Sequence, residues 1–145
     1  MDNPFEDRTN FVGRTGIVLT DVSSDHATGR VEITENHHQP YGVVHGGVYC
    51  TLIETLASTA AALWAMENGM VGVVGVNNQT DFIKATRDGV LIGEATPIHR
   101  GRTQQLWQVT VTWEADGKLV ARGQVRLQNI KDVEALSRFS HQRTE

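Results

Sequence analysis

The feature of this sequence that most restricts its fold is a helix-forming segment at residues 45–67 that is apolar around nearly its whole circumference. Alanines fill most gaps between large side chains at helical spacing: Val48, Tyr49, Leu52, Ile53, Leu56, Ala60, Leu63 and Trp64. Such a helix is typical of a protein core, and Gly69 stands where a C-terminal cap is expected. Glu54 interrupts the pattern. Because burying a carboxylate costs several kcal/mol unless the protein stabilises or uses it, Glu54 needs a role.

Segments with a period of two flank this helix. Two precede it, at residues 16–22 and 28–34, and four follow, at residues 71–84, 89–99, 107–113 and 119–127. Residues 36–44 form a loop, Asn77 and Asn78 mark a bulge, and residues 115–117 form a tight turn. The order predicts an α+β fold in which a sheet of about six antiparallel strands curls around one long helix.

Composition bounds the class of protein. The 145 residues predict one domain with a core at about 13–129 and a polar tail at 130–145 that is frayed or forms a short helix. A net charge of −4 without a basic block argues against nucleic acid as a partner. The N-terminus lacks a signal-peptide core, and the longest unbroken apolar run, residues 60–66, is too short to span a membrane. We therefore expect a cytoplasmic protein without a membrane partner.

Cysteine and histidine usage narrows the chemistry further. The single cysteine, Cys50, excludes an internal disulfide framework, and its apolar setting favours an inert thiol over a nucleophile. His37, His38 and His45 have no carboxylate or cysteine beside them at ligand spacing, so no metal site is expected.

A more specific pattern combines Gln39, Gly42, the triplet of residues 45–47 (HGG), Glu54 and Ser58, and more weakly residues 99–103 (HRGRT). Over about residues 13–129 this pattern resembles the hotdog-fold acyl-CoA thioesterases, most closely the phenylacetate-pathway and 4-hydroxybenzoyl-CoA branch. The resemblance implies a hotdog fold, hydrolysis of an acyl-CoA or aryl-CoA thioester, and no cofactor, since coenzyme A is part of the substrate. It also implies a homo-oligomer, with a tetramer expected.

The chemistry of Gly46 and Gly47 agrees with this resemblance. Both lie in the first turn of the helix, where backbone N–H groups lack intrahelical partners and carry the positive end of the helix dipole. Such donors can polarise a carbonyl oxygen, and a missing Cβ lets a thioester approach closely. The alternative is that the paired glycines only permit tight packing where the chain enters the helix.

Glu54 lies eight residues after Gly46, which is about 12 Å along a helix axis. One thioester group cannot contact both positions within a single chain, but two antiparallel helices in a dimer would bring Gly46 of one chain opposite Glu54 of the other. By resemblance, Gln39 and the Gly46 amide bind the carbonyl from one chain. Glu54 of the other chain then acts as nucleophile or as the base that activates water.

Two further residues have open roles. Ser58 lies one turn beyond Glu54 and would hold water or orient the carboxylate, or else bond back to the helix backbone. His45 would protonate the departing thiolate or make a structural hydrogen bond, and its position at the helix start favours the structural role. For Glu54 the alternatives to catalysis are a structural ion pair or a helix that is less buried than its pattern indicates, and no Lys or Arg stands within four residues to pair with it on the helix.

The rest of the substrate is assigned by position. Arg100 and Arg102, with Thr103 nearby, are the expected partners of the coenzyme A phosphates, and Lys84 and Arg87 are reserve candidates. Around the acyl group and its approach we place Tyr41, Tyr49, Val76, Asn77 and Phe82.

Two other functions remain open. A hotdog acyl-thioester dehydratase or hydratase would use His38 or His45 with Glu54, although Gln39 and HGG fit hydrolysis better. A non-catalytic acyl-CoA-binding protein would give no reason to keep Glu54 in an apolar helix.

Overall fold

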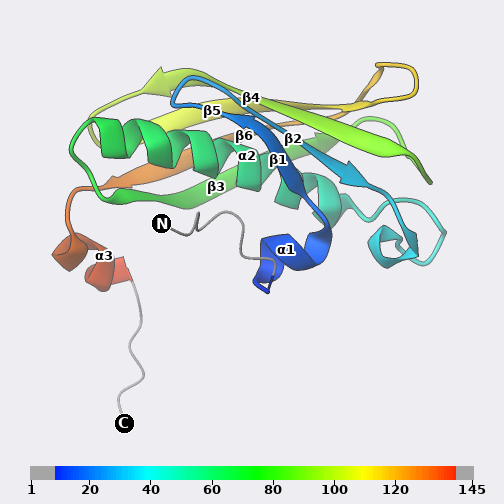
Figure 1. Cartoon of the computed structure of the whole chain (residues 1–145), viewed down its shortest axis with the longest axis horizontal. Coiled ribbons are helices and arrows are strands. Elements are labelled where there is room, and N and C mark those ends of the chain that lie inside the picture. The colour runs from blue at the N-terminus through cyan, green and yellow to red at the C-terminus, as the bar shows by residue number, and fades with distance from the viewer. Residues whose placement is uncertain (1–8, 140–145) are drawn as a thin grey trace, which may run out of the picture.

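The computed structural model describes residues 9–139 and has one long helix, α2 (Gly46–Glu67), lying across one face of a six-stranded antiparallel sheet (Figure 1). The strands follow the order β1-β2-β4-β5-β6-β3. Their bounds are β1 Val18–Val22, β2 Ala27–Glu32, β3 Gly72–Phe82, β4 Val90–Arg100, β5 Gln104–Trp113 and β6 Leu119–Ile130. The predicted α+β architecture of a long helix wrapped by about six strands is confirmed.

Both ends of α2 are capped by local hydrogen bonds. At the start, the His45 ring accepts a hydrogen bond through Nδ1 from the Gly47 N–H, at 2.8 Å. At the end, Gly69 adopts a φ of 78°, and the N–H groups of Gly69 and Met70 donate to the carbonyls of Met66 and Ala65. This is a Schellman motif, so the predicted cap at Gly69 is confirmed and the helix stops where the sequence indicates.

The sheet presents small residues to α2, which lets the helix approach closely. Gly29, Gly93 and Gly123 lie on the face that holds the helix, and a Cβ at Gly93 would clash with the Leu56 side chain. By length and composition α2 resembles a membrane-spanning helix, but 50% of the apolar window is buried within the protein. Because its fully buried residues include Leu52, Ile53 and Leu56, α2 forms the core of the domain.

Three short elements accompany the long helix and the six strands. Helix α1 (Phe11–Thr15) precedes β1, and a 3-10 helix, η1 (Glu35–His37), interrupts the predicted loop. At five and three residues they are too short to produce a hydrophobic period. Helix α3 (Val133–Phe139) lies in the predicted tail and realises its short-helix alternative, while the rest of that tail, from residue 140, lies outside the described residues.

Strand β3 forms one edge of the sheet. It pairs with β6 on one side, and the register shifts between Gly75 and Asn77, close to the predicted bulge. Within residues 9–139 no strand pairs with its other side. Val71, Val76 and Phe82, in or beside this strand, are exposed. An edge strand of eleven residues leaves a row of backbone donors and acceptors available to a partner strand.

Candidate active site

The Glu54 carboxylate lies half-buried between α2 and the edge strand β3. Its Oε1 accepts a hydrogen bond from the Ser58 hydroxyl at 3.3 Å, and its Oε2 accepts one from the Asn78 amide at 3.2 Å. Gly75 provides the space, because a Cβ at that position would clash with Oε1. Each oxygen of the carboxylate is therefore held by one donor.

Within the described part of the chain, Glu54 forms no ion pair with a lysine or arginine. In this arrangement both oxygens of the Glu54 side chain act as hydrogen-bond acceptors. The Ser58 hydroxyl points at this carboxylate and not back at the helix backbone. A structural ion pair, which was the alternative to catalysis, thus has no partner among residues 9–139.

The Gly46 N–H, in the first turn of α2, has no acceptor among residues 9–139. The His45 N–H donates to the His37 carbonyl, the Gly47 N–H to the His45 ring, and the Val48 N–H to the His45 carbonyl. Among the described residues, none accepts from the Gly46 N–H. Gly46 is therefore the donor that remains available at this helix terminus, while the Gly47 N–H is occupied by the cap.

Within residues 9–139, the side-chain amide of Gln39 is hydrogen-bonded through its oxygen alone. A tight turn closes where the Gly42 N–H donates to the Gln39 carbonyl at 2.9 Å, and the Gln39 side-chain oxygen accepts from the Tyr41 N–H. In residues 9–139 no acceptor bonds the Gln39 Nε2. The free end of this amide is a donor, which is the group that a carbonyl ligand requires. Tyr41 itself is 85% exposed at the tip of the turn.

The Phe82 ring lies beside Gly46 and packs near the Tyr49 ring. A Cβ at Gly46 would clash with the Phe82 ring, which approaches the Tyr49 ring to a centroid distance of 5.9 Å. The Tyr49 hydroxyl is fixed by Thr86 Oγ1 at 2.8 Å. The structure thus brings together three residues predicted from sequence, and it leaves Val76 in the exposed bulge of β3.

The two arginines near the β4–β5 turn, Arg100 and Arg102, have different surroundings. The Arg100 guanidinium donates to the Ser24 carbonyl at 2.9 Å, pairs with Asp25 and lies over the Trp64 ring. It fastens β4 to the β1–β2 turn, and its contact with a phosphate stays a prediction. Arg102 is exposed instead and lines a hollow of about 510 Å³ at the end of α2. Trp64, Asn68, Gly69, Met70 and Lys131 complete the lining.

The other predicted phosphate contacts are dispersed. Thr103 is exposed, and its carbonyl accepts from the Asn129 N–H at 2.9 Å. Lys84 and Arg87 line a different hollow of about 400 Å³, beside Trp113. Thr103 thus adjoins Arg102 in the same turn, whereas Lys84 and Arg87 line a hollow separate from the one that Arg102 lines.

Asn78, and not Asn77, faces the helix. Asn77 pairs with the exposed Arg126, whereas Asn78 pairs with the fully buried Val125. Successive residues of a strand point to opposite faces, so the side chain of Asn77 lies on the outer face, away from Glu54. The sequence signals a bulge here, but the exact position of the bulge decides which asparagine faces inward.

The three histidines near α2 bond to backbone groups. His37 Nε2 lies 2.6 Å from the Thr15 carbonyl and His38 Nε2 lies 2.7 Å from the Arg87 carbonyl. His45, the helix cap, is exposed and lines a hollow of about 840 Å³ together with Gly47. Among residues 9–139 no group of three or more His, Cys, Asp or Glu is placed to hold a metal ion. Cys50 is a half-buried free thiol.

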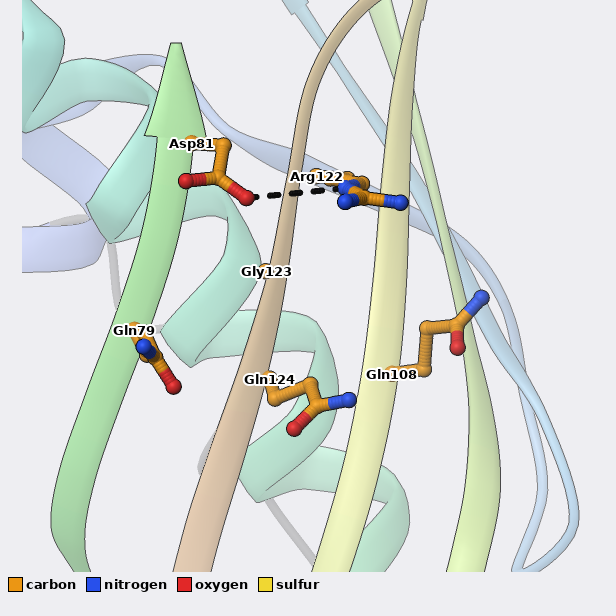
Figure 2. A pocket seen from close by; sticks show the side chains of 6 residues that line it. All are labelled: Gln79, Asp81, Gln108, Arg122, Gly123 and Gln124. Atoms are coloured by element: carbon orange, nitrogen blue, oxygen red, sulfur yellow. Dashed lines mark ion pairs between the residues drawn. The ribbon is translucent and has the colours of Figure 1, made fainter.

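A separate polar hollow lies on the opposite face of the sheet. Figure 2 shows Gln79, Gln124 and Gln108 lying across β3, β6 and β5, with Asp81 directed toward Arg122. Asp81 and Arg122 form an ion pair at 3.5 Å. The sheet separates this hollow of about 250 Å³ from α2, so it forms no part of the site around Glu54.

Comparison with known proteins identifies the family. Residues 41–120 match the model of the thioesterase superfamily. Protein Rv1847 of Mycobacterium tuberculosis is 48% identical over 122 residues, which cover 83% of this chain and 86% of that protein. Its solved structure gives a TM-score of 0.81 at 47% identity and covers 84% of this chain and 97% of the other.

Two further relatives carry names that state an activity. The proofreading thioesterase EntH of Klebsiella pneumoniae is 32% identical over 100 residues, covering 69% of this chain and 72% of EntH. The 1,4-dihydroxy-2-naphthoyl-CoA hydrolase of Listeria monocytogenes is 33% identical over 101 residues, covering 70% of this chain and 80% of the hydrolase. Together with the family match and the six-stranded sheet around α2, they establish that the chain belongs to the thioesterase superfamily and is a thioester-hydrolysing enzyme of the hotdog fold.

Proposed function

We propose that this enzyme hydrolyses an acyl-CoA or aryl-CoA thioester at sites shared between two subunits. The observation that carries the proposal is the Glu54 carboxylate, which is held at both oxygens by Ser58 and Asn78 and has no cation paired with it in the described chain. The Gly46 N–H, which has no acceptor among residues 9–139, supplies the hydrogen-bond donor that would polarise the thioester carbonyl. In a shared site it comes from the α2 helix of the other subunit.

The shared site follows from the positions of these two groups. Gly46 and Glu54 are about 12 Å apart on one helix, and the β3 edge beside Glu54 has no partner strand within residues 9–139. If two copies pair through β3 about a two-fold axis, their α2 helices run antiparallel. Gly46 of one subunit then faces Glu54 of the other. A tetramer of such dimers rests on the family resemblance alone.

Each group has a defined part in the reaction. The Gly46 N–H and the Gln39 amide hold the thioester oxygen and stabilise its negative charge in the tetrahedral intermediate. Glu54 of the partner either takes a proton from the attacking water or attacks the carbonyl carbon itself to form an anhydride that water then opens. In both routes the C–S bond breaks, the thiolate takes up a proton, and the products are a free acid and coenzyme A.

The acyl group is proposed to be aromatic, as in the phenylacetate and 4-hydroxybenzoyl branch. Support comes from the Tyr49–Phe82 pair beside Gly46, because offset or tilted aromatic contacts stabilise a third ring placed against them. The Listeria relative, whose name states an aryl-CoA substrate, points the same way. Phe82 is 58% exposed in the single chain, so its ring is accessible to a substrate.

The coenzyme A phosphates are proposed to lie near Arg102 and Lys131. Trp64, which lines the same hollow, is ten residues beyond Glu54 on α2, or roughly 15 Å along the axis. An extended pantetheine arm spans that separation. The Arg102 guanidinium and the Lys131 ammonium are suited to phosphate oxygens.

The test is release of thiol from a panel of aliphatic and aromatic CoA esters by the native protein and by Glu54→Gln. We expect turnover of at least one aromatic ester and a loss of about a hundredfold or more in kcat for the variant. Chromatography of the products would show free acid and coenzyme A. Folded native protein that binds the esters without releasing thiol would refute hydrolysis. Hydrated or dehydrated thioester products would instead identify the dehydratase reaction.

A further inference from the structure

The Asn78 side chain joins three parts of the site at once. Its Nδ2 donates to Glu54 Oε2 at 3.2 Å and to the backbone carbonyl of Cys50 at 3.1 Å. Cys50 lies one helical turn before Glu54, so a single amide on β3 bridges the helix backbone and the carboxylate. These two bonds use both hydrogens of the amide.

Thr80 fixes the orientation of this amide. The Thr80 hydroxyl donates to Asn78 Oδ1 at 2.7 Å, so the oxygen of the amide faces along β3 and the nitrogen faces α2. The Thr80 hydroxyl lies directly above Gly123, where a Cβ would clash with Oγ1. Because a carboxylate and a backbone carbonyl only accept hydrogen bonds, Glu54 and Cys50 require the nitrogen to face α2, and the Thr80 hydroxyl holds the oxygen that this orientation leaves on the other side.

We infer, on the basis of the proposed function, that Asn78 is a positioning residue for Glu54 and that Thr80 orients Asn78. Ser58 holds one oxygen of the carboxylate from within α2, and Asn78 holds the other from β3. Together they prevent rotation of the carboxylate about its terminal torsion. The remaining lone pairs keep a fixed direction toward the edge where the partner subunit would present the thioester.

This role predicts an effect mainly on kcat, because Asn78 acts through the Glu54 carboxylate. The informative variant is Asn78→Asp, which keeps the shape and the bond from Thr80 but replaces the donor facing Glu54 with an acceptor. A hydrogen bond to a charged group contributes enough to predict a loss of roughly 10- to 100-fold in kcat, with KM within about twofold. Thr80→Val, which removes only the neutral hydroxyl bond, should lose roughly 2- to 10-fold.

The matched control is Gln79→Ala. Gln79 neighbours Asn78 on the same strand, carries an amide, and faces the outer side of the sheet (Figure 2). We expect it to keep kcat within about twofold. If Asn78→Asp also keeps kcat within about twofold while remaining folded, Asn78 does not position the catalytic group.

A second measurement separates this inference from the proposed function. Crystal structures of native protein and of Asn78→Asp would show the Glu54 side chain directly, with or without turnover. The inference expects the carboxylate to leave its place between Gly75 and Ser58 in the variant. An unchanged Glu54 conformation would overturn it. A displaced carboxylate in a protein that hydrolyses no ester would retain the positioning role and reject thioester hydrolysis alone.

Discussion

Glu54 is surrounded by a hydroxyl, an amide and a glycine in the described chain, and each neighbour constrains its carboxylate differently. Ser58 and Asn78 supply hydrogen bonds, whereas Gly75 supplies only space. The space is as necessary as the bonds, because the carboxylate occupies the position that a side chain on residue 75 would fill.

Gly75→Ala tests this steric requirement. The added methyl group would displace Oε1 of Glu54, and we expect kcat to fall by about tenfold or more, as ångström-scale misplacement of a catalytic group does. The fold should survive, since Glu54 is a flexible side chain and φ at Gly75 is not positive. Steady-state kinetics with the best ester and circular dichroism would measure both effects.

The control is Gly72→Ala on the same strand, where an added Cβ meets no atom within 4 Å. It should retain native kcat. Equal activity in the two alanine variants would show that the carboxylate need not lie against β3.

The sequence alone predicts a functional role for Glu54, because a carboxylate is conspicuous in an apolar helix. It does not predict Asn78 or Gly75, because their roles depend on the register shift between Gly75 and Asn77. One extra residue in a strand reverses which side chains face inward. The contacts of Arg100 are unpredicted for a related reason: its partner Asp25 lies far away in the sequence and is brought near only by the pairing of β2 with β4.

At the level of elements, a buried hydrogen-bond network supports the β4–β5 turn that carries Arg102. The Asn129 amide donates to the carbonyls of Gly101 and Arg102, and the Gln105 amide links Asn129 to the Ala61 carbonyl of α2. Gln105 is 1% exposed. The turn is therefore fixed relative to the helix, and Arg102 is presented on a rigid support.

Arg102→Ala combined with Lys131→Ala tests whether this support serves the nucleotide. We expect KM for CoA esters to rise by about tenfold or more while kcat changes little, because phosphate contacts distant from the bond that breaks contribute mainly to binding. The same acyl group on N-acetylcysteamine lacks the phosphates, so its KM should not change.

Arg122→Ala removes a positive charge from the outer face of the sheet and controls for net charge. If the double variant and Arg122→Ala affect KM for CoA esters equally, the phosphates bind elsewhere.

Helices and strands are predicted well from the sequence where the hydrophobic period repeats several times. The helix predicted at residues 45–67 begins at Gly46, since His45 is the cap, and all six strands are present. Helix α1 is missed because its stability comes from caps at Asn10 and Gly16 and from the distant His37. None of these produces a periodic pattern in the sequence.

At the level of the whole molecule, the separation of Gly46 from Glu54 requires a second chain under the proposed mechanism, and the β3 edge, unpaired within residues 9–139, is where that chain is expected to pair. Mixed dimers test that requirement. Glu54→Gln and Gln39→Ala should each be nearly inactive alone. A dimer containing one of each has one intact site, with Gln39 from the first chain and Glu54 from the second.

Refolding equal amounts of the two variants together should restore about a quarter of native activity, because half of the random dimers are mixed and each has one intact site. Thiol release by the refolded mixture, compared with each variant refolded alone, is the measurement. If the mixture stays inactive although sedimentation shows dimers, each site is built from one chain only.

The absence of a cation beside Glu54 in the described chain has a consequence for the end of the catalytic cycle. The thioester that enters is uncharged at its carbonyl, but the acid that forms is an anion next to the regenerated glutamate. Two such charges 4 Å apart repel by about 4 kcal/mol at the effective dielectric constant of a protein surface. Under the proposed mechanism Glu54 thus favours departure of the product, and the free acid is expected to be a weak inhibitor even when its thioester binds well.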